Sequence, residues 1–243
     1  MSSAVLCEYL PWDSDLFGYR IGRVAPHRLD AASMDQALAW CRQERIDCLY
    51  LLSDSDASDT VRLAEDHRFR LVDIRLTLEC ALETASSSTT NGVTIRPCCA
   101  ADLPASRQIA RQSHRDGRFY HDAQFSESLA DRFYETWIEA SVQGFAQAVF
   151  VADIDGQAVG YVSCHRDEGG PGRIGLLGVA SSCRGRGVGK ALVQHAQRWC
   201  AAQGAREMSV VTQGRNRAAQ RLYQRCGFTT SRMQLWYHRW FTR

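Results

Sequence analysis

Long apolar runs, an excess of charge of one sign and paired-cysteine motifs are all missing from this chain of 243 residues. No apolar run approaches the roughly 20 residues of a membrane-spanning helix, and Met1-Ser-Ser-Ala leads into no signal-peptide pattern. The 29 basic and 27 acidic side chains nearly cancel, so charge alone indicates neither a nucleic-acid partner nor a membrane surface. We therefore expect a cytoplasmic protein.

Metal and nucleotide motifs are missing as well. None of the ten cysteines lies in a Cys-x-x-Cys pair, so we expect no metal and reduced, mostly buried thiols. The glycine-rich stretch 183–200 fails the Walker pattern, because Arg184 stands where the first glycine belongs and Ala191 follows Gly189-Lys190. It also fails Gly-x-Gly-x-x-Gly, because Lys190 occupies the last position.

The same stretch does have the features of an anion-binding loop. Its glycines let the backbone come close to an anion, and a helix expected over 188–203 would add unpaired N–H groups. Arg186 and Lys190 also fit a plainer interpretation, as solvated cations near a helix start. Gly187 and Gly189 are harder to explain in that way, because glycine inside a helix costs about 1 kcal/mol relative to alanine.

A small, polar stretch divides the chain. We expect residues 85–92 to be a linker between an amino-terminal domain, 1–84, and a larger domain, 93–243. The larger domain alternates strands and helices. Expected strands cover 93–97, 173–180, 207–212, 228–240 and a hairpin at 148–165 that turns at Asp155-Gly156; expected helices cover 126–144, 188–203 and 216–226.

Two motifs in this order resemble the signature of the GCN5-related N-acetyltransferase (GNAT) superfamily. The first is Val179 followed by Arg184-x-x-Gly187-x-Gly189, and the second is Asn216-x-x-Ala219-x-x-x-Tyr223 followed by Gly227-Phe228. The resemblance covers about 93–240. It implies an α/β fold with a mixed, mostly antiparallel central sheet flanked by helices, and an acyltransferase that uses acetyl-CoA.

The resemblance also implies residue roles. The glycine loop would hold the pyrophosphate of coenzyme A, with contacts from Leu177, Val179, Arg184, Gly185, Arg186, Gly187, Val188, Gly189, Lys190, Asn216 and Tyr223. A backbone N–H at Gly178 or Val179 would stabilise the oxyanion. Tyr223 would protonate the departing thiolate; its plainer interpretation is a helix residue that packs on the sheet.

The amino-terminal segment looks like a degenerate half-copy of the catalytic domain. An offset of 159 residues aligns 37–69 with 196–228 without a gap, so that Trp40-Cys41 meets Trp199-Cys200. Ala57 then stands at the position of Asn216, and Ala64 at that of Tyr223. We expect this domain to have no coenzyme site and to serve as scaffold or substrate wall.

Three stretches carry a closer resemblance, to bacterial TDP-fucosamine acetyltransferases: Leu10–Val24, Gly117–Tyr120 and Arg132–Gly144. Such enzymes acetylate the amine of a nucleotide-linked 4-amino-4,6-dideoxyhexose, here by direct attack in a ternary complex. The loop residues Arg115, Arg118, Phe119, Tyr120 and His121 would bind that acceptor, with cations for the diphosphate and aromatic rings for stacking. An ordinary surface loop is the alternative. Trp12, Asp13, Phe17 and Gly18 fit a packing turn.

Several questions stay open at this level. The general base could be His114, His121, Asp122, His165 or an ordered water. The acceptor could instead be a protein N-terminus, a lysine or a polyamine, and a non-catalytic coenzyme-binding module is a further alternative. The sequence indicates a small-molecule acceptor without nucleic acid or membrane, and it leaves open whether the chain forms a homodimer.

Overall fold

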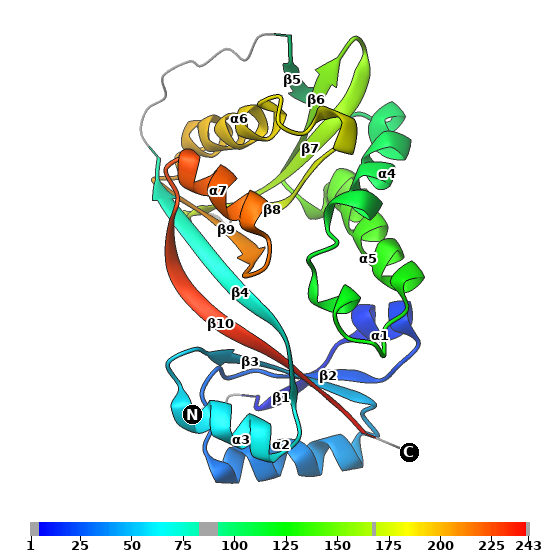
Figure 1. Cartoon of the computed structure of the whole chain (residues 1–243), viewed down its shortest axis with the longest axis vertical. Coiled ribbons are helices and arrows are strands. Elements are labelled where there is room, and N and C mark those ends of the chain that lie inside the picture. The colour runs from blue at the N-terminus through cyan, green and yellow to red at the C-terminus, as the bar shows by residue number, and fades with distance from the viewer. Residues whose placement is uncertain (1–4, 83–91, 167–168, 242–243) are drawn as a thin grey trace. The chain divides into compact units, whose positions relative to one another are not determined.

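The computed structural model describes residues 5–82, 92–166 and 169–241, so most of the expected linker lies outside the described residues. The chain packs as two compact units, each assembled from separate stretches. Unit 1 comprises 1–75, 117–129 and 233–243, and unit 2 comprises 76–116 and 130–232. Two long strands, β4 (Arg70–Ala81) and β10 (Thr229–Trp240), contribute to both units and are neighbours in the sheet (Figure 1).

Unit 1 is a sheet with the strand order β1-β2-β3-β10-β4. Its other elements are β1 (Cys7–Tyr9), α1 (Pro11–Phe17), β2 (Ile21–Val24), α2 (Ala31–Gln43), β3 (Cys48–Asp54), α3 (Ser58–Asp66) and a 3₁₀ turn, Arg118–Tyr120. Helix α2 begins where Asp30 accepts a hydrogen bond from the Ser33 amide at 2.8 Å. Met34 and Leu38 of this helix join Leu49 and Leu51 of β3 in an apolar core.

The other face of the unit 1 sheet is aromatic. Phe17 of α1 lies 4.7 Å from Phe119 and 4.5 Å from Phe125 between ring centroids. Phe125 packs in turn against His238 and Trp240 of β10, at 5.8 and 5.1 Å. The turn around Phe17 and Gly18 therefore packs the segment 117–129 onto this sheet.

Unit 2 has the strand order β10-β4-β9-β8-β7-β6-β5. Its other elements are β5 (Thr94–Pro97), α4 (Leu103–Ser113), most of α5 (Glu127–Ala140), β6 (Ala148–Ile154), β7 (Gln157–Arg166), β8 (Gly172–Val179), α6 (Val188–Ala202), β9 (Glu207–Gln213) and α7 (Arg217–Arg225), with 3₁₀ turns at Ala100–Asp102 and Ser181–Cys183. Pairings β5–β6, β6–β7 and β7–β8 are antiparallel, and β8–β9 is parallel. The mixed, mostly antiparallel sheet expected from the motifs is confirmed.

Helices α4 and α6 cover opposite faces of this sheet. A Cβ added at Gly160 of β7 would meet Val188 and Leu192 of α6, whereas one added at Gly178 would meet Ile109 of α4 and the Tyr161 ring. Gly160 and Tyr161 are consecutive, and consecutive strand residues face opposite sides. The central strands are therefore buried on both faces.

Two local expectations can be compared with the structure. The hairpin turns at Asp155-Gly156, with φ of 52° and 80°, as the sequence predicts. The helix expected over 126–144 differs: α5 ends at Ala140 and gives way to a π-helical turn, Ser141–Phe145, in which Gly144 has φ of 112°. Glycine adopts this conformation without a Cβ penalty. The regular α-helix therefore ends about one turn before Gly144, and the π-helical turn follows it.

Element bounds repeat at the predicted offset of 159 residues. When 159 is added to their residue numbers, the bounds of β3, α3 and β4 become those of β9, α7 and β10. The strands pair crosswise, however, because β3 pairs with β10 rather than with β4, which follows it in the same stretch.

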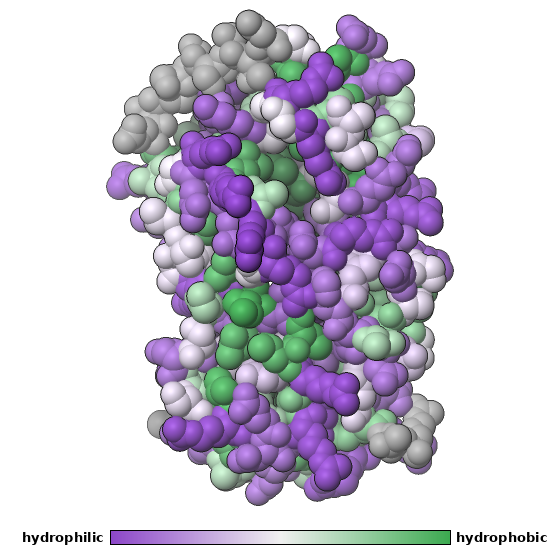
Figure 2. All heavy atoms as spheres, viewed as in Figure 1, coloured by the Kyte–Doolittle hydropathy of each residue, from purple (hydrophilic) through white to green (hydrophobic). Residues whose placement is uncertain are grey.

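Surface and thiols also agree with the composition. Most of the face drawn in Figure 2 is hydrophilic, and no helix within the described ranges is long and apolar enough to cross a membrane. Seven of the ten cysteines are buried, so the prediction of mostly buried thiols is met.

Candidate active site

Strand β8 leaves its parallel neighbour partway along its length. It pairs with β9 from Gly172 to Ile174 and then continues to Val179. On its other side a β-bulge sets two residues, Gly175 and Leu176, opposite a single residue of β7. A bulge bends the strand that carries it and increases its twist. The bulge therefore begins where the pairing between β8 and β9 ends, and the two strands separate beyond it.

Ser163 holds the bulge in place. It is the β7 residue opposite Gly175 and Leu176, and its Oγ accepts a hydrogen bond from the Leu176 amide at 2.8 Å. Ser163 is fully buried and Leu176 is nearly so. Since the bulge removes this amide from the regular ladder, the serine hydroxyl satisfies a buried donor that would otherwise have no partner.

Backbone direction at the end of β8 follows from the antiparallel pattern with β7. The Ala180 amide donates to the Val159 carbonyl at 2.9 Å. Hydrogen-bonded pairs alternate with non-hydrogen-bonded pairs along an antiparallel ladder. Ala180 and Val159 form one hydrogen-bonded pair, so Gly178 and Tyr161 form the next, and Val179 takes the non-hydrogen-bonded position between Gly178 and Ala180. The N–H and C=O of Val179 therefore face away from β7, on the side that β9 has left.

The Val179 carbonyl shows this direction through its partners. It accepts from Ser113 Oγ at 3.4 Å and from Arg184 Nε at 3.3 Å. Arg184 also donates to the Gln112 carbonyl at 3.5 Å. Arg184 thus ties the end of β8 to the end of α4, a structural contact that its place in the glycine motif did not predict.

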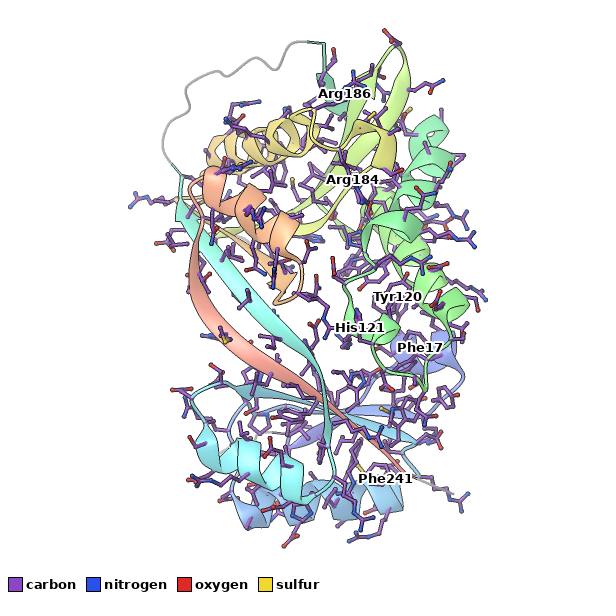
Figure 3. The ribbon with its side chains drawn as sticks, viewed as in Figure 1. Phe17, Tyr120, His121, Arg184, Arg186 and Phe241 are labelled. Atoms are coloured by element: carbon purple, nitrogen blue, oxygen red, sulfur yellow. The ribbon has the colours of Figure 1, made fainter. Side chains whose placement is uncertain are left out.

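The glycine loop follows directly and opens α6 (Figure 3). Gly185 and Gly187 have φ of 77° and 83°, a region that residues with a Cβ rarely adopt. Gly187 is the N-cap of α6, and the Ala191 amide makes the first bond of the helix, to the Gly187 carbonyl at 3.0 Å. The amides of 188–190 precede that bond, so they are free of intrahelical partners and available to an anion.

Gly189 has a different surrounding. A Cβ added there would lie 3.1 Å from Leu222 Cδ2 on α7. The structure therefore supplies a packing reason for this glycine, the close approach of α7 to α6, next to the coenzyme contact that the motif implies.

Helix α7 carries the second motif. Asn216 is its N-cap, and Oδ1 accepts from the Ala219 amide at 3.0 Å. Tyr223 is 5% exposed and packs against Phe228 with 5.8 Å between ring centroids. Burial raises the pKa of the Tyr223 hydroxyl, which therefore carries its proton at neutral pH. At the matching positions of α3, Ala57 makes no side-chain cap and Ala64 is buried.

The five loop residues expected to bind the acceptor divide between the units. Arg115 belongs to unit 2 and pairs with Asp131 at 3.2 Å. Arg118, Phe119, Tyr120 and His121 belong to unit 1, where Figure 3 labels Tyr120 and His121. Arg118 faces Asp13 at 3.8 Å, and Phe119 is 1% exposed. Both cations thus face carboxylates, which offsets the positive charge on which the expectation of an anion-binding loop rested.

The base candidates are also placed. His114 Nε2 forms a hydrogen bond with the Tyr161 hydroxyl at 2.9 Å. The His114 ring stacks on Tyr134 with 4.6 Å between the ring centroids. Burial, with a smaller effect of Arg184, lowers the pKa of His114 to about 4, so the ring is neutral at neutral pH. His165 is 5% exposed, and a Cβ added at Gly175 would lie 2.3 Å from its Nε2.

Asp122, the carboxylate among these candidates, lies in unit 1. One oxygen, Oδ2, accepts from His238 Nδ1 at 2.7 Å and from Trp240 Nε1 at 2.9 Å. Within the described part of the chain, no three His, Cys, Asp or Glu side chains gather as metal ligands would.

Sequence reasoning missed Ser163, Tyr161 and the Arg184 contact. A serine inside the apolar run of β7 was a signal, since a buried hydroxyl needs a partner. Nothing local to Arg184 or Tyr161 indicates that the last turn of α4 and its C-cap His114, more than 40 residues away in the chain, supply their partners.

The comparison with known proteins matches the part of the chain that carries the glycine loop and α7. Residues 112–228 match the model of the acetyltransferase (GNAT) family. The chain is 34% identical over 140 residues to a dTDP-fucosamine acetyltransferase of Escherichia coli, covering 57% of this chain and 59% of that protein. It is 28% identical over 140 residues to the spore coat polysaccharide biosynthesis protein SpsD of Bacillus subtilis, covering 57% of this chain and 48% of that protein. The chain thus aligns with only about half of these relatives' lengths.

A solved structure is similar in fold over nearly the whole chain. A GCN5-related N-acetyltransferase from Sphaerobacter thermophilus superimposes with a TM-score of 0.69 at 18% identity, covering 96% of this chain and 76% of that one. At this identity the likeness concerns the fold alone.

Proposed function

We propose that the chain transfers acetyl from acetyl-CoA to a primary amine, because residues 112–228 match the model of the acetyltransferase (GNAT) family. One observation carries the proposal. The backbone of Val179 turns away from β7 into the space that β9 leaves, and a glycine loop at a helix start follows within the same unit. The first feature suits a thioester carbonyl, and the second suits a diphosphate.

The coenzyme would bind to backbone groups more than to side chains. Its pyrophosphate would accept from the amides of 185–190, where two glycines with positive φ and the α6 N-terminus turn N–H groups outward. Arg186 and Lys190 are exposed and would add charge. The arm would follow β8 past Leu177, since amides of the arm can pair with the strand edge that β9 leaves open.

For the oxyanion donor we choose Val179 over Gly178. The ladder assigns the Gly178 amide to Tyr161, whereas the Val179 amide faces the open side. A fixed backbone donor at this place stabilises the charge that develops on the thioester oxygen as the amine attacks. Asn216, whose Oδ1 caps α7, would donate to the coenzyme arm through its side-chain amide nitrogen.

Tyr223 would protonate the thiolate as it departs. Its buried hydroxyl holds its proton at neutral pH, and its ring is fixed against Phe228. The amine must lose a proton in the same reaction. His114 is neutral and paired with Tyr161, so we assign it to positioning and leave the proton to ordered water.

For the acceptor we propose the amine of a nucleotide-linked 4-amino-4,6-dideoxyhexose. The support is the 34% identity to a dTDP-fucosamine acetyltransferase, together with SpsD, a polysaccharide biosynthesis protein. A lysine or polyamine acceptor is the second candidate, because the cations of the 115–121 loop already face carboxylates.

The test measures thiol release from acetyl-CoA by the purified chain with three acceptors: a TDP-4-amino-4,6-dideoxyhexose, a lysine peptide and spermidine. We expect release that depends on the sugar nucleotide and forms its N-acetyl product. Release with the peptide or spermidine alone would replace the acceptor. Tight acetyl-CoA binding without release to any amine would make the chain a coenzyme-binding module instead.

A further inference from the structure

One residue at the open end of β8, Val179, points both of its backbone polar groups away from β7. In a continuous sheet, such a residue donates its N–H to the next strand and accepts from that strand through its C=O. Strand β9 pairs with β8 only from Gly172 to Ile174. Val179 therefore has a backbone donor and a backbone acceptor that the β8–β9 ladder does not use.

The acceptor is used within the protein. Two side chains lie within hydrogen-bond distance of the Val179 carbonyl: Ser113 Oγ at 3.4 Å and Arg184 Nε at 3.3 Å. A carbonyl oxygen has two lone pairs, so these two donors satisfy it. What Val179 can offer to a ligand is then its N–H, and this end of β8 is a donor site rather than an ordinary strand edge.

Arg184, labelled in Figure 3, reaches this carbonyl from the glycine loop and belongs to the same unit as β8 and α4. Its Nη2 donates to the Gln112 carbonyl at 3.5 Å. Gln112 lies in the last turn of α4, where carbonyls have no intrahelical partner and a cation is favourable. The donors of a guanidinium form a rigid, planar fork, so one side chain can hold both carbonyls in a fixed relation.

The charge of Arg184 is also well placed for the proposed reaction. The N–H and C=O of one strand residue point to the same side, so an oxyanion bound to the Val179 N–H would lie near the carbonyl oxygen of the same residue. That oxygen carries partial negative charge and would repel the oxyanion. A guanidinium bonded to it offsets this repulsion. Burial and, to a smaller extent, the charge of Arg184 lower the pKa of His114 to about 4, so the cation acts on groups at this end of α4.

We propose that Arg184 is a positioning residue for acetyl transfer: its guanidinium holds the Val179 carbonyl against the end of α4 and so directs the Val179 N–H at the thioester oxygen. The inference rests on the proposed function, because the oxyanion forms only in that reaction. It assigns Arg184 to the rate of the chemical step, whereas the glycine motif alone implies a contact with the coenzyme.

Arg184→Met tests this role, because it keeps an unbranched side chain and removes the charge and both donors. Steady-state thiol release with the sugar nucleotide would give kcat, and calorimetry with coenzyme A would give the coenzyme affinity. We expect kcat to fall about 10-fold or more, because the donor loses its fixed position. The Kd for coenzyme A should stay nearly unchanged, since backbone amides of 185–190 would hold the pyrophosphate. Arg184→Lys keeps the charge without the fork, so its kcat should lie between those of Arg184→Met and the wild type.

A second readout needs no acceptor. A hydrogen bond to the thioester oxygen weakens its C=O bond, so infrared difference spectra of acetyl-CoA labelled with ¹³C at that carbonyl report the Val179 contact directly. We expect the band to move to lower wavenumber when acetyl-CoA binds to the wild type. Arg184→Met should lose most of this displacement at equal occupancy, and Arg184→Lys should lose less.

Two further variants separate the carbonyl from the loop. Ser113→Ala removes the other donor to the same carbonyl and leaves the glycine loop as it is. It should move kcat and the infrared band in the same direction as Arg184→Met, with a loss of about 3–10-fold in kcat, as for one neutral hydrogen bond. Arg173→Gln is the matched control. It removes an exposed arginine near the other end of β8 and should leave kcat, coenzyme affinity and the band unchanged.

Four outcomes would overturn the inference: wild-type kcat in Arg184→Met, an equal band displacement in Arg184→Met and the wild type, no displacement in the wild type, or a loss of coenzyme affinity with kcat retained. The last result would make Arg184 a coenzyme ligand. Equal losses of kcat, affinity and melting temperature in Arg184→Met and Arg184→Lys would also overturn it, because Arg184 would then only hold the loop. A displaced band without thiol release to any amine would contradict the proposed function and leave the role of Arg184 standing. Thiol release that is insensitive to Arg184 would do the reverse.

Discussion

Gly178→Ala tests the position of the Val179 amide. The added Cβ would lie 2.9 Å from Ile109 Cγ2 and from Cε1 and Cζ of the Tyr161 ring. Real Cβ atoms do not approach so closely, and the Tyr161 ring cannot give way, because it is fully buried and its hydroxyl is held by His114 at 2.9 Å. The strain should therefore move β8, and with it the amide of the next residue.

The magnitude follows from two effects. Overpacking a buried site costs about 1–3 kcal/mol of stability, and a misplacement of about 1 Å at a reacting group can cost about 100-fold in rate. We expect kcat to fall by about 10–100-fold, with a smaller change in the KM for acetyl-CoA, because the oxyanion contact forms mainly in the transition state. Steady-state thiol release and thermal unfolding of the same preparation measure both effects.

Gly172→Ala is the control on the same strand. Its Cβ would lie 2.6 Å from the Sγ of the buried Cys200, a clash of similar severity, but Gly172 lies where β8 is still paired with β9. It should lose stability and keep its kcat. Near-full turnover in Gly178→Ala, or an equal loss of kcat in Gly172→Ala, would refute the assignment of the oxyanion donor to this end of β8.

Three further variants or conditions test other parts of the account. Tyr223→Phe should lower kcat by roughly 10²–10⁴-fold with little change in acetyl-CoA affinity; full turnover with chemistry rate-limiting would place the acid elsewhere. Ser163→Ala leaves the buried Leu176 amide without its partner and should lower the free energy of unfolding by about 1–3 kcal/mol in urea titrations; no loss would mean that the bulge is held otherwise. His114 and His238 have a pKa of about 4 in the fold, against 6.5 ordinarily. The unfolded chain therefore binds more protons between these values, and stability should fall by roughly 2 kcal/mol per histidine from pH 7 to pH 5; a flat profile in urea would contradict the neutral, buried rings.

The second half of the chain was the easier to predict. Glycines stop α6 and α7 near their expected ends, and Asp155-Gly156 turns the hairpin where the pattern places it. These signals are local, so a single sequence carries them. The fold followed because the elements occur in an order that resembles the GNAT signature, and the structure confirms it.

Contacts made over long distances in the sequence could not be predicted. Asp131 and Asp13 face the two loop arginines, and no local pattern indicates either pair. The crosswise pairing of β3 with β10 depends on the whole fold in the same way. Asn216 is different, because an asparagine before an amphipathic helix is a capping signal that could have been used.

The most direct test follows acetyl transfer itself. The purified chain would be mixed with acetyl-CoA and a TDP-4-amino-4,6-dideoxyhexose, and free thiol and acetylated sugar nucleotide would be quantified over time. The account predicts that both products appear in equal amounts, require both substrates, and form much more slowly in Tyr223→Phe. Thiol release that is independent of any amine, or no release in the presence of bound acetyl-CoA, would contradict it.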